Sequence, residues 1–100
     1  MVRHIVFWKL QAQANGMSAA ENGKKMVELL LALKDKVPGA LALEAGVDIN
    51  RSPAAWDVAL YTQFPDKATL NAYQVHPEHL KVVAFIKSVT CGRSVVDFEI

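Results

Sequence analysis

The order of strand-type and helix-type periodicity constrains the fold of this chain more than any other feature. Four segments are rich in β-branched and aromatic residues, which is typical of strands: residues 2–10, 41–49, 56–64 and 93–100. Ser18 and Glu21 have the spacing of a capping box, and apolar residues then recur at helical spacing as far as Val37, before Pro38 and Gly39. The sequence therefore predicts a long helix between the first two strands, beginning at Ser18 and ending near Val37.

A second helical region follows the third strand and is divided by Pro77. Asp66 is placed to cap a short helix that carries Leu70 and Tyr73. Pro77 then forces a break, because the residue before a proline is biased away from helical backbone angles. We expect His76 to be the N-cap of a further helix with Pro77 at its first position. The apolar residues expected along this helix are Leu80, Val83, Ala84 and Ile86.

Two glycines interrupt these patterns. Gly23 lies inside the long helix, where glycine lowers the helix propensity of the first turns. Gly46 lies in the middle of the second strand, where glycine indicates a bulge or the close approach of another chain segment. The segment 11–17, which contains Gly16, is polar and is predicted to be a loop.

The element order β-α-β-β-α-β predicts an α+β fold of the ferredoxin-like type over residues 1–100, as a single domain with a four-stranded antiparallel sheet. The two helical regions can cover only one face of such a sheet. In the first strand Val6 and Trp8 point one way while Ile5 and Phe7 point the other, so both faces carry apolar residues. We therefore expect the uncovered face to pack against a second copy, which forms a homodimeric α/β barrel.

Charge, hydropathy and cysteine content exclude several classes of protein. The net charge is +1 and the basic residues are scattered among acidic ones, which argues against a nucleic-acid partner. No apolar run approaches the roughly 20 residues that span a bilayer, and the run Ile5–Trp8 is too short for the core of a signal peptide. Cys91 is the only cysteine, so neither an internal disulfide nor a thiolate metal cluster can form. We expect a protein of the reducing cytoplasm that does not bind membranes.

The candidate site is the segment 72–83, AYQVHPEHLKVV, together with His4. His79 would be the third residue of a helix that starts at Pro77, where the positive end of the helix dipole keeps an imidazole neutral and able to accept a proton. Tyr73 could donate a hydrogen bond to a carbonyl oxygen, and His4 could orient or relay from the first strand. The structural alternative is that the histidines cap and pack, and that Tyr73 anchors the broken helix.

Other ligands have weaker support. His76, His79 and His4 raise the question of a metal, but no carboxylate is clearly placed to complete the coordination, so we predict neither a metal nor a cofactor. Asp97 and Glu99 share one face of the last strand and are expected to pair with Arg3 or Lys9 if those strands are neighbours.

The opening MVRHIVFWKL, the segment YQVHPEH and the closing VVDFE resemble the stress-responsive dimeric α/β-barrel (Dabb) domain. This resemblance implies a ferredoxin-like protomer and a tight homodimer. One distantly similar member, olivetolic acid cyclase, closes a polyketide by an intramolecular aldol condensation. The resemblance implies that Tyr73 corresponds to the tyrosine of the cyclase motif and His79 to its catalytic base. It also implies that His4 corresponds to a histidine in the first strand of the cyclase. That cyclase has a further histidine in the third strand and aromatics in the first helix, which this sequence lacks, so a different substrate is expected.

Two functional hypotheses follow. In the first, the chain binds a small molecule in a pocket between sheet and helices, with acid/base chemistry of the cyclase or aldol kind carried by His79, Tyr73 and His4. In the second, it is a non-catalytic stress-associated or accessory protein that acts through binding or assembly. A metal-free monooxygenase is a third and more distant analogy, based on fold alone.

Overall fold

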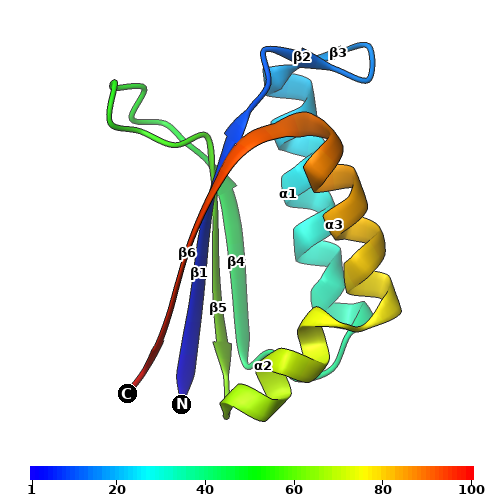
Figure 1. Cartoon of the computed structure of the whole chain (residues 1–100), viewed down its shortest axis with the longest axis vertical. Coiled ribbons are helices and arrows are strands. Elements are labelled where there is room, and N and C mark those ends of the chain that lie inside the picture. Colours follow the sequence, from blue (N-terminus) through cyan, green and yellow to red (C-terminus); the bar gives the residue numbers. More distant parts are fainter.

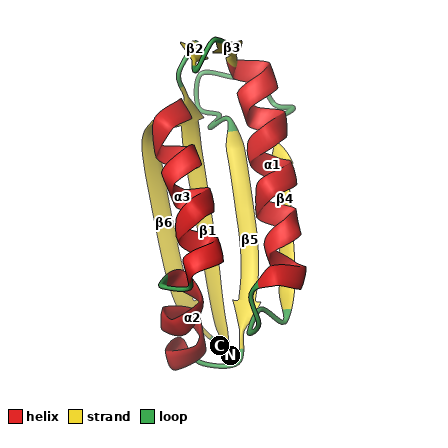
Figure 2. Cartoon of the chain, turned by 90° about the vertical axis from the view of Figure 1, so that its right-hand side faces the viewer, coloured by secondary structure: helices red, strands yellow, loops and turns green.

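The computed structural model describes all 100 residues and contains a four-stranded antiparallel sheet with helices on one face (Figure 1). The sheet strands are β1 (Val2–Leu10), β4 (Ala42–Val47), β5 (Val58–Phe64) and β6 (Thr90–Glu99), in the order β4-β5-β1-β6. The helices are α1 (Ala19–Lys36), α2 (Lys67–Gln74) and α3 (Pro77–Val89). Figure 2 shows α1 and α3 side by side across the sheet, with α2 below them. The ferredoxin-like α+β fold is confirmed.

The helix starts follow the capping residues of the sequence. The Ser18 hydroxyl accepts from the Glu21 amide, and the Glu21 carboxylate accepts from the Ser18 amide, so the capping box is complete. Asp66 caps α2 through the Thr69 amide. His76 caps α3 and Pro77 occupies its first turn, as predicted. These caps fix the point at which the candidate segment turns from α2 into α3.

The period-two pattern of β1 separates two faces. Val6 is 1% exposed and Trp8 is buried beneath the helices, whereas Phe7 is 38% exposed on the other side. The buried apolar residues of the sheet and all three helices form one core cluster of 16 residues. One face of the sheet is therefore closed by helices, and the other face is open with apolar side chains on it.

Three local predictions are wrong. The register of β4 with β5 continues through Gly46, and no atom lies within 4 Å of a Cβ placed there, so there is neither a bulge nor a close approach. The irregularity lies instead at Lys9/Leu10, between β1 and β6. Leu80 is 51% exposed, because α3 turns Val82, Ile86 and Val89 toward the core at helical spacing.

The third difference concerns the predicted loop after β1, which contains the short strands β2 (Gln13–Ala14) and β3 (Met17–Ser18). Asn15 and Gly16 connect them with φ values of 53° and 74°. Asn-Gly readily adopts the two positive φ angles of a type I′ hairpin turn, so the signal for this hairpin was present in the sequence.

Gly23 has a packing reason for its place inside α1. A Cβ at this position would lie 3.0 Å from the Leu10 Cδ1 atom. The absence of a side chain therefore lets α1 approach the end of β1, which offsets the loss in helix propensity.

None of the three helices combines the length and the apolar character that a membrane crossing requires.

Candidate active site

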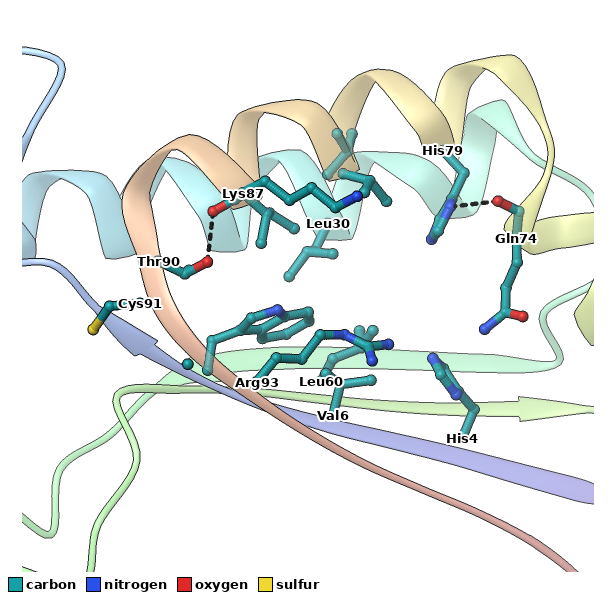
Figure 3. A pocket seen from close by; sticks show the side chains of 15 residues that line it. His4, Val6, Leu30, Leu60, Gln74, His79, Lys87, Thr90, Cys91 and Arg93 are labelled. Atoms are coloured by element: carbon teal, nitrogen blue, oxygen red, sulfur yellow. Dashed lines mark hydrogen bonds between the residues drawn. The ribbon is translucent and has the colours of Figure 1, made fainter.

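A cavity of about 630 Å³ lies between α3 and the helix-covered face of the sheet. Eight of its fifteen lining residues are hydrophobic, with Trp8, Leu30, Leu60 and Ile86 among them. The polar residues of the lining include His4 from β1 and His79 from α3 (Figure 3). The size and the mostly apolar lining are typical of a pocket for a small organic molecule.

His79 is held by a backbone carbonyl at the break between α2 and α3. Its Nδ1 atom lies 3.0 Å from the Gln74 carbonyl oxygen. A carbonyl oxygen can only accept, so in the neutral ring Nδ1 carries the proton and Nε2 is left with a free lone pair. Figure 3 shows the ring projecting from α3 into the cavity. The broken helix therefore gives His79 the tautomer that a general base at Nε2 requires.

The surroundings of His79 favour its neutral form. Burial is the main cause that lowers the pKa of His79 below its ordinary value near 6.5. The bond to the Gln74 carbonyl acts in the opposite direction, while the charges of His4, Arg93 and His76 lower the pKa further. At neutral pH the ring is therefore unprotonated and able to accept a proton.

His4 faces the same cavity from β1 and is 5% exposed. Its Nδ1 atom lies 2.5 Å from the Asp97 Oδ1 atom, because the two residues are register partners in β1 and β6. The backbone of His4 is held as well, since the Thr62 hydroxyl donates to its carbonyl oxygen over 2.9 Å. A carboxylate on Nδ1 orients the ring and leaves Nε2 directed away from Asp97. His4 and Asp97 therefore form a histidine–carboxylate pair at the wall of the cavity.

Tyr73 occupies a different place from the one that its predicted role requires. It is 4% exposed and is not part of the cavity lining. Its ring centroid lies 5.1 Å from that of Phe64 and 5.1 Å from that of His79. Burial raises the pKa of Tyr73 to about 12, so its hydroxyl keeps its proton. The structure brings His4 and His79 together at the cavity and places Tyr73 behind His79, packed against its ring.

His76 is engaged in the helix start. Its Nδ1 atom accepts from the Glu78 amide over 3.1 Å, and the residue does not line the cavity. No group of three or more His, Cys, Asp and Glu side chains is arranged to hold a metal ion.

Sequence reasoning missed Asp97 as the partner of His4. The expected pairing with Arg3 or Lys9 is wrong, because those odd-numbered residues of β1 point to the open face while Asp97 points to the helix-covered face beside His4. Arg3 donates instead to the Tyr61 hydroxyl over 2.9 Å, and Lys9 donates to the Ala55 carbonyl. The parity of His4 and Asp97 would have revealed the pair only with the register of β1 and β6 in hand.

The arrangement suits acid/base chemistry on a carbonyl compound. The neutral His79 ring has an unprotonated Nε2 atom that can accept a proton, and the His4 ring is hydrogen-bonded to the Asp97 carboxylate. Proton abstraction beside a carbonyl requires a base and a hydrogen-bond donor, and His4 can be that donor at Nε2 only when its ring carries both protons.

Solved structures of several proteins share this fold. A dimeric protein of unknown function from Bacteroides fragilis is 27% identical, with a TM-score of 0.84, and the match covers 99% of this chain and 95% of that one. A dimeric ferredoxin-like protein of unknown function from Jannaschia sp. is 25% identical, with a TM-score of 0.77 and coverage of 99% and 98%. A hydroxynitrile lyase from Passiflora edulis is 19% identical, with a TM-score of 0.82 and coverage of 97% and 90%.

The likeness to the lyase shows the fold alone. No protein of curated function matches the sequence. The family model of the stress responsive A/B barrel domain (Dabb) matches residues 2–100. Because that match spans nearly the whole chain, the protein belongs to the stress responsive A/B barrel domain family, as the resemblance of its strands and of its YQVHPEH segment predicted.

Proposed function

We propose that this protein binds a small carbonyl compound in the cavity between α3 and the sheet and abstracts a proton from the carbon beside the carbonyl, with His79 as the base. The observation that carries the proposal is the bond from His79 Nδ1 to the Gln74 carbonyl, which leaves Nε2 unprotonated at a mostly apolar cavity. The lowered pKa of His79 supports the same role, because the free base is then present at neutral pH.

The step uses two imidazoles. His79 Nε2 takes the α-proton, and the electron pair of the broken C–H bond moves to form the C=C bond of an enolate whose charge lies on oxygen. His4, when its ring carries both protons, donates from Nε2 to that oxygen, while Asp97 accepts from Nδ1 and balances the imidazolium charge. The enolate can then take a proton back or attack a second carbonyl, as in an aldol reaction. Tyr73 supports the His79 ring by packing against it.

We also propose that the protein is a homodimer joined through the open face of the sheet. Phe7, Val96 and Phe98 lie on that face and are 38%, 57% and 41% exposed. The Bacteroides fragilis and Jannaschia proteins of the same fold are described as dimeric. Burial of such a face removes the apolar surface from water and covers an otherwise exposed sheet. As a single free thiol is compatible with reducing conditions, we assign the dimer to the cytoplasm.

A binding function without chemistry is the second candidate. The observation that favours it is the position of Tyr73, which packs in the core and not at the cavity. In this case the cavity holds a ligand, and the histidines serve only to recognise it. The family's accessory or stress-associated role would then depend on binding or assembly.

The test is exchange of the α-protons of 2-octanone for deuterium in D₂O, followed by proton NMR. We expect the wild-type protein to accelerate exchange and His79→Gln to lose the acceleration by roughly a hundredfold, in the range of general-base contributions. His76→Asn is the matched control: it removes a histidine three positions away and keeps an effective N-cap, so it should exchange at the wild-type rate.

Equal exchange by wild-type and His79→Gln proteins would contradict the assignment of the base. Binding of 2-octanone in the cavity without any exchange would favour the non-catalytic function.

A further inference from the structure

We infer that the ligand of this cavity carries a carboxylate, and that Arg93 binds this group where the cavity opens beside β6. The inference rests on the proposed function, since it concerns the same cavity, and it adds the charge class of the ligand and the residue that selects it. Acid/base chemistry on a carbonyl does not itself require a charged ligand. The charge preference of the cavity and the role of His79 as a base can therefore be tested separately.

Arg93 reaches the cavity from the edge strand β6. It is the register partner of Trp8, and like Trp8 and His4 it belongs to the helix-covered side of the sheet. Figure 3 shows its side chain extended in the direction of His4, between the sheet and α3. The positive charge of Arg93 is one of the smaller causes that lower the pKa of His79, after burial. The Arg93 side chain therefore lines the same cavity as the two histidines.

The positive charges of the cavity lining lie on exposed residues that have no ion-pair partner in the chain. The only two ion pairs are His4 with Asp97 and Lys81 with Glu78, so neither Arg93 nor Lys87 has a carboxylate partner. Lys87, from α3, is the second cation of the lining, and no aspartate or glutamate lines the cavity. A ligand with a negative charge would find two cations at the exposed side of the cavity that no carboxylate of the chain occupies.

The chemistry of the lining points to a carboxylate on an apolar body. A guanidinium binds a carboxylate through two parallel N–H bonds, which gives both strength and a fixed orientation. The remaining surface, which includes Val6, Leu30 and Ile86, suits a hydrocarbon chain or ring. The expected ligand class is therefore a monocarboxylate with an apolar portion, in which a reactive carbonyl would lie between the two histidines.

The experiment compares octanoate with octanamide, which have the same chain and differ in charge. Isothermal titration calorimetry of the wild-type protein at about pH 7.5 should show octanoate binding at least about tenfold more tightly, in line with the worth of hydrogen bonds to charged groups. Arg93→Gln should remove that preference by weakening octanoate and leaving octanamide unchanged. Arg51→Gln is the control, because it removes the same charge from the exposed turn after β4.

A second readout is the NMR titration of His79. Bound octanoate should raise the pKa of His79 in the wild-type protein, because a nearby anion favours the imidazolium, and should raise it less in Arg93→Gln. The inference is overturned if octanoate and octanamide bind equally, if octanoate does not bind, or if Arg51→Gln lowers octanoate affinity as much as Arg93→Gln. Such results leave the exchange of 2-octanone unaffected, so failure of this inference is distinguishable from failure of the proposed base.

Discussion

Neighbouring residues of the same strands have different surroundings on the two faces of the sheet. On the helix-covered face, His4 is 5% exposed and is bound to Asp97, and beside it lies a cavity between α3 and the sheet. On the open face, Arg3 donates to the Tyr61 hydroxyl, which also accepts from the Gln63 amide. The first group presents a free imidazole nitrogen to a cavity, whereas the second consists of polar groups that bind one another among apolar side chains.

This difference shows why polarity alone does not locate the candidate site. On the open face the side chains of Arg3, Tyr61 and Gln63 bind one another, although one Arg3 nitrogen is buried without a partner in the isolated chain. The polar groups at the cavity leave an atom available to a ligand. We therefore propose chemistry at the covered face and association with a second copy at the open face.

The largest effect should come from placing the same charge on either side of β1. Val6→Asp buries a carboxylate in the core and should cost roughly 4 kcal/mol or more, a large share of a stability of about 5–15 kcal/mol. Phe7→Asp should leave the fold intact and break the dimer. Circular dichroism melting and sedimentation equilibrium measure the two outcomes. A melting temperature of Val6→Asp equal to that of the wild-type protein, or a dimeric Phe7→Asp protein, would contradict the division of the faces.

The next effect concerns the carboxylate behind His4. Asp97→Asn should reduce the exchange of 2-octanone about tenfold or more, because the amide no longer fixes the protonated Nδ1 of His4 or balances the imidazolium. The tautomer of His4, read from its ¹⁵N chemical shifts, should change at the same time. Glu99→Gln, on the same side of β6 but two residues away, should leave both unchanged. Retention of the wild-type rate by Asp97→Asn would show that Asp97 is only structural.

A smaller effect compares the adjacent hydroxyls of β5. Thr62→Val removes the buried donor to the His4 carbonyl and should cost about 1 kcal/mol. Tyr61→Phe acts on the open face and should change monomer stability by less than about 0.5 kcal/mol. Urea unfolding of both variants in the Phe7→Asp background separates folding from association. Equal losses would mean that the open-face hydroxyl is as important to the fold as the covered one.

The smallest effect is the pH dependence that His79 contributes to stability. Its pKa is lower in the folded state than in the unfolded state, so between the two values the unfolded chain binds more protons and stability rises with pH. The contribution is complete above the unfolded value near 6.5 and is lost as the pH falls toward the folded value. Urea unfolding between about pH 5 and 7.5 should show a weaker pH dependence for His79→Gln than for His76→Asn.

Most of the fold could be predicted from local signals. The capping box at Ser18, the Asp66 cap and the His76-Pro77 start are sequence patterns with direct backbone consequences, and the structure has all three. The Gly46 and Leu80 predictions were wrong because they depend on what lies across from each residue, which tertiary packing decides.

The candidate site also contains one feature that local sequence patterns predict and others that depend on tertiary packing. His79 at the start of a helix could be recognised, because its position in the first turn depends only on Pro77. The partnership of His4 and Asp97, separated by 93 residues, depends on the register of two strands. The place of Tyr73 behind His79 depends on how α2 packs against Phe64, and no local pattern encodes that contact.

The central claim is that His79 presents an unprotonated Nε2 atom to the cavity at neutral pH. Long-range ¹H–¹⁵N correlation spectra of the wild-type protein, recorded across its pH titration, test this directly. The account predicts a proton on Nδ1, none on Nε2, and a pKa below the ordinary value near 6.5. A proton on Nε2 in the neutral ring, or a pKa at or above the ordinary value, would contradict it.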